Sequence, residues 1–134
     1  MGKFLLATLS YAVITLALAY PWHMLWFHEL YLSLGAYTRA EPSVTLGMTA
    51  MLLQGLIIAY LYPRFYSGGS ALLSGIRFGL IYALIQYSVM GLAMAAKIDI
   101  NPIPVYLGYS LLFQLIQGTL TGAAVGLIYA RPRA

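Results

Sequence analysis

Four long apolar runs, separated by short polar stretches, dominate the pattern of hydrophobic and polar positions along the chain. They cover about residues 4–27, 43–62, 75–96 and 105–130. A helix needs about 20 apolar residues to cross the roughly 30 Å hydrocarbon core of a bilayer, and each run is close to that length. The pattern therefore predicts one all-α integral membrane domain over residues 1–134, built as a four-helix transmembrane bundle.

The end of the first run differs from the others because Pro21 and a cluster of aromatic residues follow one another there. Proline has no backbone N–H and removes one helical hydrogen bond, so the helix should either kink or end at this point. Tryptophan and tyrosine gather at the interfaces of a bilayer. We expect a short, aromatic-rich interfacial segment after the first helix. The predicted interfacial residues are Trp22, Trp26 and Tyr31, with Arg77 reaching the surface from the start of the third run.

Composition supports a membrane environment, since 62% of residues are hydrophobic and only 7% are charged. A soluble domain carries about 25% charged residues. The formal net charge is +4, but the seven basic residues are scattered and form no basic stripe. A nucleic-acid partner is therefore not expected, and the lipid bilayer is. The absence of cysteine excludes disulfides and thiolate metal sites.

The charges between the runs predict an orientation, because short cytoplasmic loops are enriched in Lys and Arg. Four spans place both termini on one side. That side would carry only basic residues: Lys3, Arg64, Arg77, Arg131 and Arg133. The other side would carry both signs: Glu29, Arg39, Glu41, Lys97 and Asp99. The asymmetry predicts a plasma or inner membrane protein with both termini in the cytoplasm.

Small residues recur every four positions in the last two runs. The third run contains Gly75, Gly79, Ala83 and Gly91, and the fourth contains Gly118, Gly122 and Gly126. Each glycine costs a soluble helix about 1 kcal/mol relative to alanine, whereas in a bilayer such a stripe lets another helix approach closely. The stripes predict either contacts with a partner protein or packing within the bundle. The short loop between the two runs favours packing against each other.

Four glutamines interrupt the apolar runs. Gln54, Gln86 and Gln117 lie near the middle of their runs, and Gln114 lies about one turn from Gln117. Lipid cannot satisfy an amide, so these side chains should turn inward and bond across helices. Such bonds average about 0.6 kcal/mol, which makes them modest structural contacts. The alternative is a polar path for a small neutral solute.

Candidate chemistry is sparse. No run has Asp, Glu or Lys near its middle, so a proton relay or an ion-coupling site is not expected. His23 and His28 are the weak candidates for holding a cofactor. They lie about 140° apart on a helix, unlike the i, i+4 pairs that share a metal. The prediction is no cofactor, no metal and no enzymatic activity.

These features predict a small membrane protein that acts by association. The leading hypothesis is an accessory or scaffold subunit of a larger membrane complex, with protein partners in the membrane or further copies of itself. A second hypothesis is a small oligomeric transporter or channel for a neutral or lipid-like solute. A third is a cofactor-binding protein or enzyme that uses His23 and His28 at its outer face.

Overall fold

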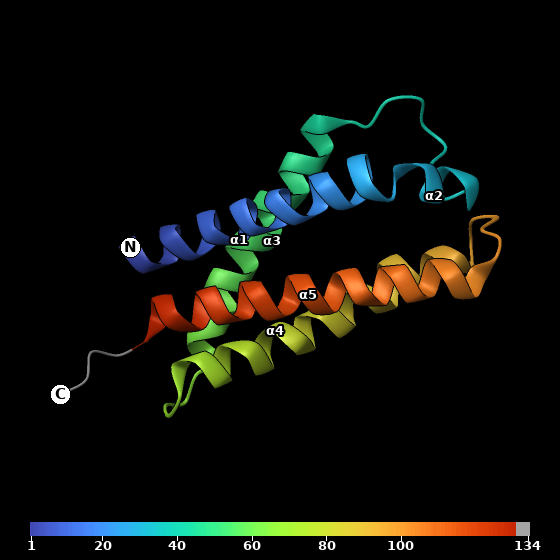
Figure 1. Cartoon of the computed structure of the whole chain (residues 1–134). Coiled ribbons are helices and arrows are strands. Elements are labelled where there is room, and N and C mark those ends of the chain that lie inside the picture. The colour runs from blue at the N-terminus through green and yellow to red at the C-terminus, as the bar shows by residue number, and fades with distance from the viewer. Residues whose placement is uncertain (131–134) are drawn as a thin grey trace.

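The computed structural model describes residues 1–130, and every regular element within them is helical (Figure 1). The elements are α1 (Gly2–Tyr20), η1 (Pro21–Trp26), α2 (His28–Ser33), α3 (Val44–Phe65), α4 (Ala71–Tyr87), η2 (Ser88–Ala93) and α5 (Ile103–Tyr129), where η1 and η2 are π-helical. Four stretches are long and apolar enough to cross a membrane: Gly2–Trp26, Val44–Phe65, Ala71–Ala93 and Ile103–Tyr129. The predicted set of four long apolar helices is confirmed.

Helix boundaries differ from the predicted ones at the prolines and at the caps. The backbone continues through Pro21 as the wider π-helical turn η1 and does not stop there. Helix α3 passes through Pro63 to Phe65, and the Tyr66 amide closes its last turn by donating to the Tyr62 carbonyl at 2.9 Å. Helix α4 begins earlier than predicted because Ser70 caps it, accepting from the Leu73 amide.

Two helix pairs make up the bundle. Helices α4 and α5 lie side by side over most of their length, whereas α3 crosses α1, which also packs on α5 (Figure 1). The α1–α3 crossing is close at Gly55, where an added Cβ would lie 2.9 Å from the Thr8 carbonyl oxygen. Helix α3 has few contacts with α4, although only a short link joins them. The bundle is therefore open between α3 and α4.

The distribution of side chains suits a lipid solvent. Among the described residues, the buried positions include Thr8, Thr15, Gln117 and Thr121, while leucine, isoleucine and valine side chains cover the outside of all four long helices. A soluble bundle would bury such side chains and expose polar ones. In lipid the apolar side chains face outward and the polar groups must find partners inside.

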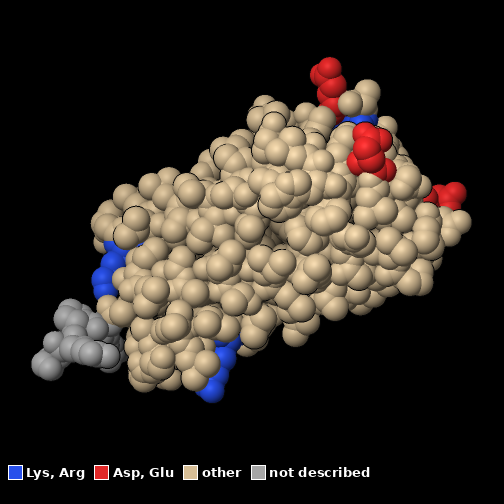
Figure 2. Space-filling view, in the orientation of Figure 1, with Lys and Arg blue, Asp and Glu red and all other residues tan. Residues whose placement is uncertain are grey.

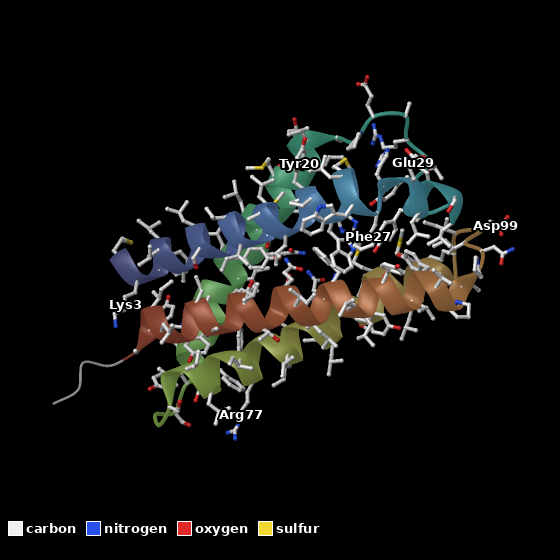
Figure 3. The ribbon with its side chains drawn as sticks, in the orientation of Figure 1. Lys3, Tyr20, Phe27, Glu29, Arg77 and Asp99 are labelled. Carbon is white, nitrogen blue, oxygen red and sulfur yellow. The ribbon has the colours of Figure 1, made fainter. Side chains whose placement is uncertain are left out.

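Charged residues gather at the two ends of the molecule (Figure 2). Lys3 lies at one end, where its Nζ donates to the Ala130 carbonyl at 2.9 Å and ties the start of α1 to the end of α5. Glu29 of α2 and Asp99, which precedes α5, lie at the opposite end (Figure 3). We call these the basic end and the acidic end. Arg131 and Arg133, which also entered the predicted orientation, lie outside the described residues.

Candidate functional site

Polar side chains from all four long helices meet inside the bundle. We call this group the tyrosine–glutamine network; it consists of Tyr11, Thr15, Gln54, Tyr82, Gln86 and Gln117. The Tyr11 hydroxyl is its centre: it donates to Gln54 Oε1, lies 2.6 Å from the Tyr82 hydroxyl and accepts from Gln117 Nε2 at 3.3 Å. One phenol therefore joins α1, α3, α4 and α5.

The remaining bonds of the network run outward from this centre. Gln117 Nε2 donates to Thr15 Oγ1 at 2.7 Å, and Gln86 Nε2 donates to the Tyr82 hydroxyl at 2.6 Å. Sequence reasoning had not singled out Tyr11 and Thr15. A signal for them exists, because Thr8, Tyr11 and Thr15 are spaced three and four residues apart and form one polar stripe on an otherwise apolar helix.

The glycines of α4 and α5 face each other. An added Cβ at Gly79 would lie 2.9 Å from the Gly122 Cα, and one at Gly126 would lie 2.9 Å from the Gly75 Cα. Gly118 faces the buried Ala83 in the same way, with a separation of 2.7 Å. The structure thus brings together all the small residues predicted for packing except Gly91, whose nearest neighbour is the ring of Tyr87. Both stripes are occupied within the chain.

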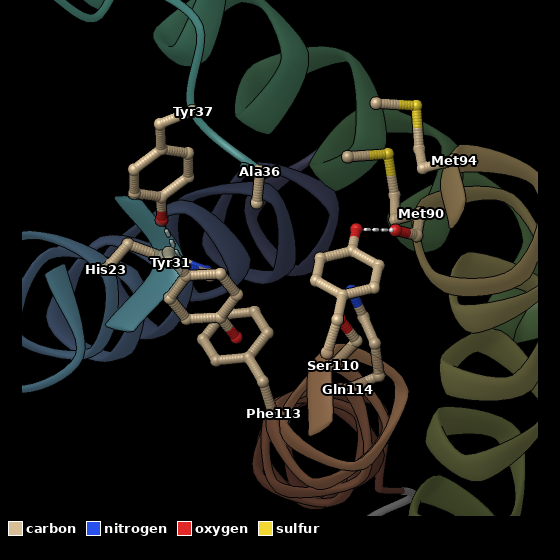
Figure 4. A pocket seen from close by; sticks show the side chains of 10 residues that line it. His23, Tyr31, Ala36, Tyr37, Met90, Met94, Ser110, Phe113 and Gln114 are labelled. Atoms are coloured by element: carbon tan, nitrogen blue, oxygen red, sulfur yellow. Dashed lines mark hydrogen bonds between the residues drawn. The ribbon is translucent and has the colours of Figure 1, made fainter. Parts of the chain in front are cut away.

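A second polar group lines a pocket of about 160 Å³ at the acidic end (Figure 4). We call it the tyrosine pocket; its lining residues are His23, Tyr31, Ala36, Tyr37, Met90, Met94, Tyr106, Ser110, Phe113 and Gln114. A wider hollow of about 440 Å³ shares Ala36, Tyr37 and Met94 with it and extends to Arg39. The pocket is therefore built between α5, α2, η1, η2 and the segment that leads to α3.

Both π-helical turns border this pocket. Turn η1 contributes His23, and η2 contributes Met90, whose carbonyl accepts from the Tyr106 hydroxyl. A π turn has a wider hydrogen-bonded loop than an α turn and is frequently found at functional sites. Two of them on one small pocket single it out as the candidate binding site.

Tyr37 lies between the two histidines and is hydrogen-bonded to His23. Burial, together with Tyr31 and Tyr106, raises the pKa of the Tyr37 hydroxyl, which keeps its proton at neutral pH. That hydroxyl forms a hydrogen bond of 2.9 Å with His23 Nδ1. The His28 Nδ1 forms a hydrogen bond of 3.2 Å with the His23 carbonyl, in which the carbonyl is the acceptor.

The two histidines therefore have separate roles. Their rings flank Tyr37, with centroids 6.4 Å from it for His23 and 5.9 Å for His28. Within residues 1–130, no group of three His, Asp or Glu side chains is placed to hold a metal ion. His23 and Tyr37 form a hydrogen-bonding wall of the tyrosine pocket.

Gln114 is the unusual residue of the tyrosine pocket. Its side chain is buried, and its Oε1 has no hydrogen-bond partner within the described part of the chain. A buried polar atom left without a partner costs about 1–3 kcal/mol. Unlike Gln54, Gln86 and Gln117, it takes no part in the tyrosine–glutamine network. Gln114 therefore places a buried, unpartnered amide oxygen next to the pocket.

The residues predicted at the interface separate into two groups. Trp26 is 69% exposed and Arg77 is exposed on α4. Trp22 and Tyr31 are instead buried, and the Trp22 Nε1 donates to the Tyr31 hydroxyl at 3.1 Å. Turn η1 directs Trp22 toward Phe113 of α5, with 5.6 Å between the ring centroids. Of the two, Tyr31 lines the tyrosine pocket.

Comparisons of the chain with protein-family models, with curated proteins and with solved structures gave no match. The residues of the pocket are the basis for any functional conclusion.

Proposed function

We propose that the chain is a multi-pass protein of a plasma or inner membrane that binds a small lipid-soluble molecule in the tyrosine pocket and does not transform it. The observation that carries the proposal is Gln114, a buried amide with an unpartnered oxygen on the wall of a pocket bordered by two π turns. A bound molecule with a hydrogen-bond donor would supply the missing partner.

The lining also indicates the kind of molecule. The pocket has aromatic walls, with Tyr31 and Tyr37 stacked at 5.4 Å between centroids, and its polar groups are hydroxyls, an amide and an imidazole. Its lining contains no Asp, Glu, Lys or Arg. A neutral ligand with a flat or compact polar head fits these walls, since a buried charge without a counter-charge is strongly unfavourable.

The adjoining hollow supports approach from the membrane. Met24, Leu32, Met94 and Ile98 give it an apolar lining, and Arg39 stands at its polar edge. Ligand sites of this kind combine apolar walls with a few polar groups that orient the molecule. In the proposed orientation the basic end faces the cytoplasm, so the pocket opens near the outer surface.

The proposal is tested by purifying the protein in membrane discs that retain native lipid and identifying bound molecules by mass spectrometry. We expect one neutral molecule at close to one per chain in the wild type. Gln114→Leu should reduce its amount at least tenfold. Leu112→Ala, at a 50% exposed position of the same helix, should leave it unchanged. Equal recovery from both variants, or no enriched molecule, would contradict the proposal.

A second candidate function is association, as an accessory or scaffold subunit of a larger membrane complex. The first third of α3 favours it: every residue from 44 to 50 is exposed, including Gly47 and Thr49. This part of the helix is available for contact with another protein. Native electrophoresis in mild detergent, with mass spectrometry of co-migrating proteins, tests the idea. Recovery of a lone monomer would exclude it.

A further inference from the structure

A lipid-facing groove separates α3 from α4. Its volume is about 290 Å³, and its lining residues are Gln54, Ile57, Ile58, Leu61, Phe78, Ile81, Tyr82, Ile85 and Gln86. The groove exists because the two helices diverge from their short connecting link and have few contacts with each other (Figure 1). It is distinct from the tyrosine pocket and shares no residue with it.

Two amide groups reach this groove with one end already bonded. Gln54 accepts through Oε1 from Tyr11 and Tyr82, and Gln86 donates through Nε2 to Tyr82. Within residues 1–130, no further hydrogen bond reaches the other ends, Gln54 Nε2 and Gln86 Oε1. The groove therefore presents one free donor and one free acceptor. At the depth of the hydrocarbon core, lipid can satisfy neither of them.

We propose that a second copy of this chain occupies the groove, related to the first by a two-fold axis along the membrane normal. This inference concerns association with another copy of the chain, through a surface other than residues 44–50, and does not depend on ligand binding. In the dimer, Gln54 Nε2 of each copy donates to Gln86 Oε1 of the other. The dimer then contains two such hydrogen bonds, one on each side of the two-fold axis. Together they satisfy both free amide ends in each copy.

A second copy is a suitable partner because each groove carries both an unused amide donor and an unused amide acceptor. Two copies inserted in the same orientation hold their glutamines at the same depth, as an isologous interface requires. Around the amides, Ile57, Leu61, Ile81 and Ile85 are between 44% and 60% exposed and would pack across the axis. A lipid chain could cover these side chains, but it has no donor or acceptor at that depth.

Disulfide cross-linking in native membranes tests the dimer, and the chain is suited to it because it contains no cysteine. Residues near a two-fold axis meet their own copies, so Ile57→Cys and Ile85→Cys should each give a reducible product of twice the chain mass on mild oxidation. Val13→Cys and Leu120→Cys, exposed on α1 and α5 away from the groove, are the matched controls and should stay monomeric. All four positions are lipid-facing, so the fold is unaffected.

A second measurement separates the amide contact from general contact. Gln86→Leu in the Ile85→Cys background should lower the cross-linked fraction several-fold, whereas Gln114→Leu, in the tyrosine pocket, should leave it unchanged. Groove cysteines that cross-link no better than the controls would overturn the proposal. A product with a different protein in place of the dimer would overturn it as well. Loss of ligand binding alone, with cross-linking intact, would contradict only the first proposed function.

Discussion

The Tyr11 hydroxyl makes more contacts across helices than any other side-chain group described in this bundle. The Tyr11 residue is 0% exposed on α1, and its hydroxyl forms hydrogen bonds with Gln54, Tyr82 and Gln117 on three other helices. Removing the oxygen would leave each of those groups with one partner fewer in surroundings that cannot replace it. The effect of this one atom should therefore exceed that of a single interhelical hydrogen bond.

Tyr11→Phe is predicted to lower the free energy of unfolding by about 1–2 kcal/mol, because several bonds of modest size are lost together. Unfolding of the purified protein by SDS in mixed micelles measures the change. Tyr60→Phe is the matched control: Tyr60 is 53% exposed on α3, and its hydroxyl makes no hydrogen bond among the described residues. Equal stability of the two variants would show that the network is not a source of stability.

At the scale of residues, the sequence predicted that the glutamines bond inside the bundle, but it did not predict which residues they bond to. Glutamines in apolar runs must bond inside a bundle, and three of them do meet at Tyr11 and Tyr82. Gln114 lies only one turn from Gln117, yet it lines a different site. No local pattern distinguishes the two, because the difference depends on where α2 and η1 pack against α5.

At the scale of elements, the contact between α4 and α5 depends on the absence of side chains. An added Cβ at Gly122 would lie 2.9 Å from the Gly79 Cα and would meet the Gly75 carbonyl. These are backbone atoms, which cannot move aside as the end of a flexible side chain can. The two helices would have to separate along the whole contact.

Gly122→Leu is predicted to prevent the α4–α5 contact and so to destabilise the monomer itself, by at least 3 kcal/mol, beyond the usual cost of overpacking. Gly108→Leu is the control on the same helix, since an added Cβ there has no neighbour within 4 Å. Resistance to proteolysis in detergent should fall sharply for the first variant and not for the second. A stable Gly122→Leu monomer would be inconsistent with the packing described.

The helices themselves follow from hydropathy, because a lipid slab requires about 20 apolar residues for each crossing. The π turns do not follow from it. Pro21 gives a local reason for η1, since it lacks the donor for an ordinary α-helical bond. The segment of η2, Ser88–Ala93, contains no proline, and its π geometry accompanies the packing of Met90 against Tyr106 of another helix. Such a contact between distant segments is outside the reach of local sequence patterns.

At the scale of the whole molecule, charge is separated along the bundle axis. Lys3 and Arg77 lie toward the basic end, and the acidic side chains lie at the other (Figures 2 and 3). Arg64 lies in the last turn of α3, next to the link that leads to α4. Arg64 is held in place there, with its guanidinium 3.7 Å from the centroid of the Tyr60 ring. The difference in charge between the two ends could be predicted from the sequence, because most charged residues lie in or next to the short loops.

Cysteine labelling of intact cells is predicted to place the two ends on opposite sides of the membrane. Thr38→Cys, in the exposed segment before α3, should react with a membrane-impermeant thiol reagent. Ser67→Cys, in the link between α3 and α4, should react only after the cells are permeabilised. The wild type, which has no cysteine, is the blank in both cases. The reverse pattern of reactivity would invert the proposed orientation.

The tyrosine–glutamine network has a consequence for the biogenesis of the protein. Thr15 and Gln117 bond to each other although they are separated by 102 positions in the chain. If α1 inserts into the membrane before α5 is made, Thr15 has no side-chain partner and Tyr11 lacks its bond to Gln117 until the last helix is inserted. A chain that stalls or is cut before α5 would therefore display unpaired polar groups within the membrane. A membrane chaperone or protease can recognise an unfinished molecule by these unpaired polar groups.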